Sequence, residues 1–372
     1  MTNRQSLKDR KRWIVKVGSA LLTDNGKGLC KSVIESLANQ IAFLRNQGID
    51  VVLVSSGSVA AGVSQLRMPS RPNNVNELQA AAAVGQAALI REYEDAFRPF
   101  DINIAQVLLT HADIANRERY LNAKSALSKL LDLDVLSVVN ENDTVATDEI
   151  CFGDNDNLAA LVANLVDADL LVILTDQNGL YTADPRSNPG AELLSEVDAN
   201  DESLAAMASG GSSVGRGGMI TKLIAAQTAS LSGASTVIAS GKEEDILQKI
   251  YQGEDLGTLL VANNRVASKK QWIAGQMKVV GSVVVDDGAE KVLKQSGKSL
   301  LAVGVSAVLG DFKRGELISC INTQGEEIAR GLSNYNAEEA DKVKGKSSAE
   351  IFDLLGYGGE SELIHRDNLV LL

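Results

Sequence analysis

The stretch VVLVSSG, residues 51–57, is a run of four apolar residues that ends in two serines and a glycine. A short Val/Leu run bounded by turn residues is typical of a strand buried on both faces of a parallel sheet. Similar runs occur at 13–18, 102–110, 135–140, 170–175 and 235–240, and amphipathic or apolar helical patterns lie between them at 32–48, 75–97, 117–131, 158–166 and 221–233. This alternation predicts an α/β fold, with an open and mostly parallel sheet sandwiched by helices.

The pattern changes after about residue 260. Short alternating strands with glycine-marked turns follow, as in GSVVVDDGA and GEEIARGLSNY, with only short helical pieces between them. Such a pattern predicts a second, small and mainly β domain. We therefore expect a first domain over 12–262, a polar linker over 263–275 and a second domain over 276–360.

Composition limits the possible functions. The 372 residues carry a formal net charge of -12, which argues against nucleic acid or an anionic membrane as the main partner. The three cysteines, Cys30, Cys151 and Cys320, are far apart, which fits a reducing compartment and no disulfide framework. The N-terminal residues lack the apolar segment of a signal peptide, and no apolar run approaches the roughly 20 residues of a membrane span. We expect a cytoplasmic protein that does not enter the membrane.

Small and polar residues follow several of the predicted strands. In an open parallel sheet, ligands bind beyond the carboxyl ends of the strands, so these residues predict a single crevice. They are Lys16, Gly18 and Ser19 at the first strand, Ser55, Ser56 and Gly57 at the second, Asn140, Glu141, Asn142 and Asp143 after 135–140, and Thr175 and Asp176 after 170–175.

The segment GGSSVGRGGMITK, residues 210–222, runs into a predicted helix. A glycine-rich loop lets backbone N–H groups approach a phosphate, and a helix N-terminus adds favourable partial charge. Lys222, in the first helical turn, is placed to meet phosphate oxygens. The alternative is a flexible surface loop that carries an ordinary lysine.

Lys16 interrupts an apolar strand, and a buried charge is costly unless it is paired. If Lys16 faces the crevice it needs a carboxylate, for which Asp156 is a candidate; otherwise it extends to solvent from an edge strand. Asp156 belongs to GDNDN, residues 153–157, directly before an apolar helical run. The alternative for this stretch is a helix cap by Asp154 or Asn155.

Together these segments resemble the amino-acid kinase family. The motifs KVGSALL, VVLVSSGSVAAG, NENDTVAT, GDNDNLAAL, LTDQNGLYTADPRSNP and GRGGMITK stand in the order found in that family, over residues 12–260. They are most similar to the glutamate 5-kinases (gamma-glutamyl kinases). The later segments VVVDDGAEKVL, GKSLLAVGV, FKRGE and IARGLSNY resemble a PUA domain, which many bacterial members of that group carry.

The resemblance implies ATP-dependent phosphorylation of the side-chain carboxylate of L-glutamate, the first step of proline biosynthesis. By the same resemblance Ser56, Asp143 and Asn155 bind glutamate, and Asp156 orients two phosphate-facing lysines, Lys16 and Lys222, as the catalytic set. It also implies proline as a feedback inhibitor and a homo-oligomer, either a dimer or a tetramer. The nucleotide-binding residues it implies are Lys16, Thr175, Asp176, Arg216, Gly217, Gly218, Met219, Ile220, Thr221 and Lys222.

The chemistry agrees with this set of residues. Phosphoryl transfer needs positioning and neutralisation of charge, which lysines and backbone amides supply. The attacking carboxylate is already ionised at neutral pH, so no general base is required. We expect Mg²⁺ to be held largely by the ATP phosphates, with no metal ligand from the protein.

Two residues depart from the family pattern. Ser58 stands where an alanine is common, and Arg216 where a small residue is common. We expect them to affect substrate affinity and loop dynamics, and not the reaction.

Three alternative functions remain open. Related kinases act on acetylglutamate, aspartate, carbamate or UMP, and the PUA-like part favours the glutamate enzymes over these. PUA domains elsewhere bind RNA, but the second domain has a single compact basic run, KVKGK at 342–346, so nucleic-acid binding is the less favoured function. The second domain could instead serve assembly or feedback regulation.

Overall fold

The structure is a computed structural model. It describes residues 3–23, 28–146, 155–201, 203–208, 218–262, 279–355 and 361–371. The chain divides into two compact units, of which the first comprises Met1–Ala115 with Asn122–Arg265 and the second comprises Asn116–Leu121 with Val266–Leu372.

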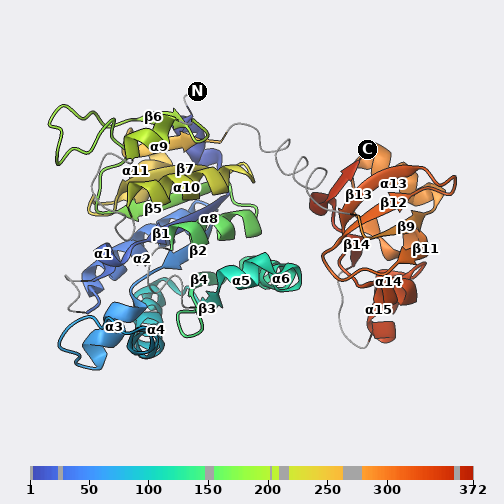
Figure 1. The fold of residues 1–372 in the computed structure, drawn as a ribbon, viewed down its shortest axis with the longest axis horizontal. Helices are drawn as coiled ribbons and strands as arrows, with labels where there is room; N and C mark the ends of the chain where they lie inside the picture. Colours follow the sequence, from blue (N-terminus) through green and yellow to red (C-terminus); the bar gives the residue numbers. More distant parts are fainter. Residues whose placement is uncertain are drawn as a thin grey trace. The chain divides into compact units, whose positions relative to one another are not determined.

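The first unit is built on an eight-stranded sheet in the order β3-β4-β2-β1-β5-β7-β8-β6 (Figure 1). Every neighbouring pair is parallel except β7 and β8, so the prediction of a mostly parallel sheet is confirmed. The two strands that the sequence pattern did not reveal, β6 and β8, are too short to show a period. The strands are β1 (Arg12–Val17), β2 (Asp50–Ser55), β3 (Ile104–Leu109), β4 (Leu136–Glu141), β5 (Leu170–Thr175), β6 (Glu196–Asp198), β7 (Ser235–Ser240) and β8 (Thr258–Val261).

Helices cover both faces of this sheet (Figure 1). One layer contains α2 (Lys31–Asn46), α4 (Val75–Phe97) and α11 (Ile246–Gln252), which share a core with β1 and β2. The other contains α8 (Asp156–Leu165) and α10 (Met219–Ser230), which pack against each other, and α8 contacts β1 and β5. The remaining elements are η1 (Arg4–Asp9), α1 (Ser19–Leu22), α3 (Ser58–Gln65), η2 (Arg98–Phe100), α5 (His111–Ala115), α6 (Arg117–Asp132) and α9 (Ser203–Ala208).

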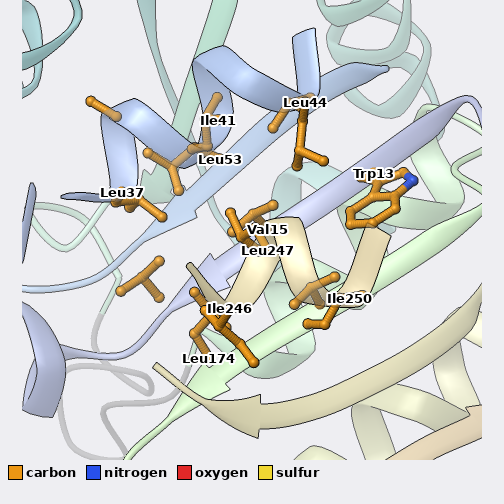
Figure 2. Packing of buried hydrophobic residues seen from close by; sticks show 14 of the residues in the cluster. Trp13, Val15, Leu37, Ile41, Leu44, Leu53, Leu174, Ile246, Leu247 and Ile250 are labelled. Atoms are coloured by element: carbon orange, nitrogen blue, oxygen red, sulfur yellow. The ribbon is translucent and has the colours of Figure 1, made fainter. Parts of the chain in front are cut away.

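Alternation along β1 decides which side chains enter which layer. Successive strand residues point to opposite faces of a sheet. Trp13 and Val15 belong to the core formed with α2 and α11, and Figure 2 shows Val15 close to Leu247 within this cluster. Lys16, one residue after Val15, therefore lies on the opposite face, toward α8.

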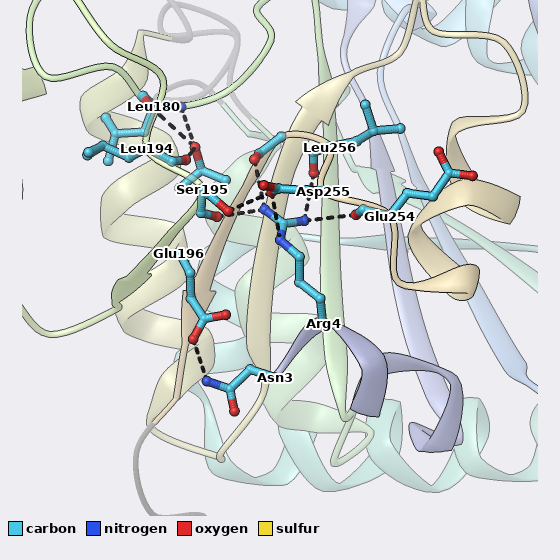
Figure 3. Close-up of polar contacts among 11 residues, drawn as sticks. Asn3, Arg4, Leu180, Leu194, Ser195, Glu196, Glu254, Asp255 and Leu256 are labelled. Atoms are coloured by element: carbon cyan, nitrogen blue, oxygen red, sulfur yellow. Dashed lines mark hydrogen bonds and ion pairs between the residues drawn. The ribbon is translucent and has the colours of Figure 1, made fainter. Parts of the chain in front are cut away.

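The N-terminal helix η1 is anchored to the sheet edge by Arg4 (Figure 3). Its guanidinium donates to the backbone oxygens of Ser195 at 2.6 Å, Leu256 at 2.9 Å and Gly257 at 2.9 Å. It also pairs with Asp255 at 3.1 Å. Arg4 is buried and joins η1 to the chain directly before β6 and directly before β8.

The second unit is mainly β, as its sequence pattern predicts. Its five-stranded sheet has the order β11-β9-β12-β13-β15, and a two-stranded sheet pairs β10 with β14. The basic run 342–346 begins inside the last turn of α14. The elements are β9 (Gly281–Val285), α13 (Asp287–Ser296), β10 (Leu300–Leu301), η3 (Ala302–Gly304), β11 (Val305–Gly310), β12 (Leu317–Ile321), β13 (Glu327–Leu332), α14 (Ala337–Val343), α15 (Ser348–Leu355), β14 (Glu362–Ile364), η4 (Arg366–Asn368) and β15 (Leu369–Leu371).

Candidate active site

Asp156 lies between two buried lysines. It begins α8 and is fully buried, while Lys16 on β1 and Lys222 on α10 are each 5% exposed. Lys222 Nζ lies 2.8 Å from Asp156 Oδ2, and Lys16 Nζ forms an ion pair with Asp156 Oδ1. The expected pairing of Lys16 with Asp156 is confirmed. The alternative of an edge strand is wrong, because β1 lies in the middle of the sheet between β2 and β5.

The two ammonium groups keep Asp156 ionised. Burial by itself raises the pKa of a carboxyl group, but the charges and hydrogen bonds of Lys16 and Lys222 outweigh it and hold the pKa of Asp156 well below its ordinary value. Thr221 adds a longer hydrogen bond, 3.2 Å from its Oγ1 to Asp156 Oδ2. The cluster of two lysines and one aspartate therefore carries a net positive charge.

Asn155 precedes α8 but does not cap it with its side chain. The alternative of a cap by Asn155 is therefore wrong, and Asp154 lies outside the described residues. The side chain of Asn155 instead crosses to β2 and β4, where Nδ2 donates to the backbone oxygen of Ser55 and to Asn140 Oδ1, both at 2.7 Å. These bonds tie the start of α8 to the carboxyl ends of two central strands.

Ser56 and Asp143 lie at the same end of the sheet. Ser56 is half-buried after β2, and Asp143 is half-buried after β4. Ser58, buried in the first turn of α3, donates to Asp143 Oδ2 at 2.8 Å. Gly57 has φ +104°, a left-handed conformation that favours glycine and turns the chain from β2 into α3.

The remaining predicted nucleotide residues come from two elements. Thr175 ends β5 and is buried, and its hydroxyl donates to Asp176 Oδ1 at 3.2 Å while Asp176 is exposed. Gly218 precedes α10, whose first turn carries Thr221 and Lys222. In the same turn Met219 is half-buried and Ile220 is 40% exposed. Arg216 and Gly217, also predicted to bind nucleotide, lie outside the described residues.

Several residues around the site had no signal in the sequence. Gln86 and Tyr93 lie on the buried face of α4, and each meets a strand end: Asn140 Nδ2 donates to Gln86 Oε1 at 2.7 Å, and the Tyr93 hydroxyl lies 2.8 Å from Ser55 Oγ. Burial raises the pKa of Tyr93 despite its bond to Ser55. Glutamine and tyrosine are common in amphipathic helices, so only the tertiary structure distinguishes these two.

Helices α3 and α4 approach each other at two glycines. A methyl group at Gly85 would lie 1.8 Å from the backbone oxygen of Ser58, and one at Gly62 would lie 1.7 Å from that of Ala81. Contact this close requires glycine on each helix. The packing holds the first turn of α3, and with it Ser58, against α4.

The described residues contain no group of three or more His, Cys, Asp or Glu side chains that could hold a metal ion. Among these residues no helix is both long and apolar enough to cross a membrane.

Comparison with known proteins identifies both domains and the family. The Amino acid kinase family matches residues 11–240, and the PUA domain matches residues 281–355. A glutamate 5-kinase from Nitrosococcus oceani is 58% identical over 372 residues, covering 100% of this chain and 99% of that protein. A glutamate 5-kinase from Paraburkholderia phymatum is 56% identical over 371 residues, covering 99% of this chain and 100% of that protein.

A solved structure supports the same fold. The carbamate kinase from Giardia lamblia has a TM-score of 0.50 at 20% identity, covering 69% of this chain and 100% of that chain. At this identity the similarity concerns the fold alone. From the full-length relatives and the two matched domains, the chain belongs to the amino acid kinase family and, within it, to the glutamate 5-kinases.

Proposed function

We propose that this chain transfers the terminal phosphoryl group of ATP to the side-chain carboxylate of L-glutamate, giving L-glutamyl 5-phosphate and ADP as the first step of proline biosynthesis. The observation that carries the proposal is the buried carboxylate of Asp156 between Lys16 and Lys222. This cluster offers two cations at the carboxyl ends of the central strands, where a polyanionic nucleotide needs them.

The lysines and Asp156 have different roles. Lys16 and Lys222 neutralise charge on the phosphoryl oxygens as the phosphoryl group moves from ADP to the acceptor. Asp156 holds the two ammonium groups apart and fixes their positions, because each is bonded to a different oxygen of the same carboxylate. The start of α10, with Gly218, Met219, Ile220, Thr221 and the preceding Arg216 and Gly217, binds phosphate, and Thr175 and Asp176 bind the rest of the nucleotide.

Glutamate binds at the neighbouring strand ends. Ser56 and Asp143 follow β2 and β4, and Asn155 is tied to both strands by its hydrogen bonds. We assign Asp143 and Asn155 to the ammonium end of the substrate. The side-chain carboxylate then points toward the lysines, where it attacks the terminal phosphorus of ATP and the bond to the ADP oxygen breaks.

The reaction moves no proton from the nucleophile. A glutamate carboxylate is ionised at neutral pH, since its ordinary pKa is about 4.3. The site therefore needs orientation and charge neutralisation, and it needs no histidine base.

Magnesium enters this proposal with the nucleotide. Mg²⁺ keeps several waters and is commonly held by one or two carboxylates together with substrate phosphates. The described residues offer no acidic cluster that could hold the ion without the phosphates, so we assign the phosphates as its main ligands.

We further propose catalysis in a domain over 12–262, a linker over 263–275 and a PUA domain over 276–360. Feedback inhibition by proline, a dimeric or tetrameric assembly and a cytoplasmic location complete the proposal.

Trapping of the product with hydroxylamine tests the reaction directly. Hydroxylamine converts an acyl phosphate to a hydroxamate, so the assay is run with Mg-ATP and with L-glutamate, N-acetylglutamate or aspartate as acceptor. We expect hydroxamate from L-glutamate, and a loss of at least about a hundredfold in Lys222→Met. The matched control is Lys249→Met, a surface lysine of α11 that pairs with Glu243. Signal with another acceptor and none with glutamate would refute the proposed substrate.

A further inference from the structure

A buried chain of three side-chain amides lies behind the proposed glutamate site. It consists of Gln86 on α4, Asn140 on β4 and Asn155 before α8, and these side chains are 7%, 1% and 8% exposed. They are joined in sequence by hydrogen bonds of 2.7 Å, and we call them the amide relay. Gln86 has no part in the proposed function so far.

One backbone group determines the orientation of Asn140. The N–H of Glu141 donates to Asn140 Oδ1 at 2.9 Å, and a backbone N–H can only donate. Asn140 must therefore present its oxygen to Glu141 and its nitrogen to Gln86. Rotating the Asn140 amide by half a turn would set its nitrogen against the N–H of Glu141, a donor against a donor, and its oxygen against Gln86 Oε1, an acceptor against an acceptor. The neighbours therefore determine which way the amide lies.

The orientation of Asn155 follows from two acceptors. Its Nδ2 donates to Asn140 Oδ1 and to the backbone oxygen of Ser55, which can only accept. Both N–H bonds of the Asn155 amide are used in this way. What Asn155 can offer to a ligand is its oxygen Oδ1, a hydrogen-bond acceptor.

An acceptor distinguishes the two ends of an amino acid. An ammonium group carries three donors, whereas a carboxylate at neutral pH only accepts. We propose that Gln86 is a positioning residue that acts through Asn140 to keep the acceptor of Asn155 directed at the ammonium group of the amino-acid substrate. This inference rests on the proposed phosphorylation of glutamate and adds a determinant of its specificity.

Two substitutions of Gln86, at the end of the amide relay, should have different effects on glutamate binding. Gln86→Leu keeps the approximate size but removes the acceptor of Asn140 Nδ2, which leaves a buried donor unpaired. Gln86→Glu keeps an acceptor at that place. It loses no hydrogen bond among the described residues, because Gln86 Nε2 has no partner there. Ala87→Ser, on the exposed face of the same helix turn, is the matched control.

The assay compares L-glutamate with glutarate, which has both carboxylates and lacks the ammonium group. Hydroxamate formation gives KM and kcat for glutamate, and competition gives the inhibition constant for glutarate. In Gln86→Leu we expect the KM for glutamate to rise about tenfold, with kcat changed less than about threefold and the glutarate constant changed less than about twofold. Gln86→Glu and Ala87→Ser should keep the KM for glutamate within about threefold of the unsubstituted protein.

The outcomes separate this inference from the proposed function. No hydroxamate from glutamate in the unsubstituted protein refutes the function itself. Normal activity with an equal loss of glutamate and glutarate binding in Gln86→Leu overturns the inference, because a merely structural role weakens both ligands alike. Should Gln86→Leu fail to fold, a comparison of the two ligands in the unsubstituted protein tests the assignment of Asn155 Oδ1 to the ammonium group. Glutarate should bind at least about tenfold more weakly than glutamate, and equal binding of the two overturns that assignment.

Discussion

Replacing Asp156 with asparagine removes the negative charge that lies between two buried lysines. Asp156 is fully buried, and the side chains of Lys16 and Lys222 are each 6% exposed. Removal of one partner from a buried ion pair leaves an uncompensated charge and typically costs about 3–5 kcal/mol. An asparagine oxygen can still accept from one lysine, but its NH₂ group then faces the other. We therefore expect the free energy of unfolding of the first unit to fall by about 3 kcal/mol or more.

Denaturation by urea, followed through a single tryptophan, measures this change. The chain has two tryptophans, and Trp13 is fully buried in the core of the first unit. A Trp272→Phe background makes Trp13 the reporter of that unit. The matched control is Asp132→Asn, because Asp132 and Lys129 form a pair 3.9 Å apart whose side chains are 71% and 68% exposed. The control should change the free energy of unfolding by less than about 0.5 kcal/mol.

The dependence on pH gives the same experiment a second readout. The pKa of Asp156 is below its ordinary value of 3.8 in the folded protein, so its ionisation stabilises the fold. That contribution is fully present above the ordinary pKa and is lost as the pH falls through the lower folded-state pKa. The stability difference between the unsubstituted protein and Asp156→Asn should therefore be constant above about pH 5 and shrink in more acidic solution. A loss of stability in Asp156→Asn no larger than that in Asp132→Asn would refute the reasoning. So would a stability difference that grows as the pH falls.

Two further substitutions and one chemical modification have expected outcomes. Ser58→Ala removes the hydroxyl that donates to the Asp143 carboxylate at 2.8 Å, so steady-state kinetics should show a KM for glutamate raised about tenfold and little change in the KM for ATP. Arg4→Met removes the donor to three backbone oxygens at 2.6–2.9 Å, and the free energy of unfolding should fall by about 3 kcal/mol in urea denaturation. Burial raises the pKa of Cys320 to about 12, so Ellman's reagent at pH 8 should modify the half-buried Cys30 in the folded protein and Cys320 only after unfolding.

Each of these predictions has a control or a clear contrary result. Ser361→Ala deletes an exposed hydroxyl of the second unit and should leave KM unchanged. Arg98→Met removes an arginine that is 74% exposed and should cost little stability. An unchanged KM in Ser58→Ala would show that this hydroxyl does not affect glutamate binding. Equal losses in the free energy of unfolding in Arg4→Met and Arg98→Met would show that the buried hydrogen bonds of Arg4 do not stabilise the protein. Rapid modification of Cys320 in the folded protein would contradict its burial.

Local sequence patterns predict many of the strands and helices of the fold. Apolar runs such as 51–54 and 170–174 predict strands because a strand buried on both faces has no polar side, and the predicted helix at 75–97 has the same limits as α4. An isolated charge such as Lys16 within an apolar strand pointed to a buried pair, since burial of an unpaired charge is unfavourable. The resemblance of the motifs to known kinases then indicated the candidate site residues.

What the sequence by itself determined is the kind of element each segment forms and the chemical type of residue at the strand ends. Only the tertiary structure decided the order of the strands, which places β1 between β2 and β5 and so makes Lys16 a buried residue. It also decided that Gln86, Asn140 and Asn155 form one relay and that Arg4 is buried against the sheet edge. Periodicity reports the environment of a residue along its own element, whereas these contacts join residues 15 to 253 positions apart, and nothing local in the sequence encodes them.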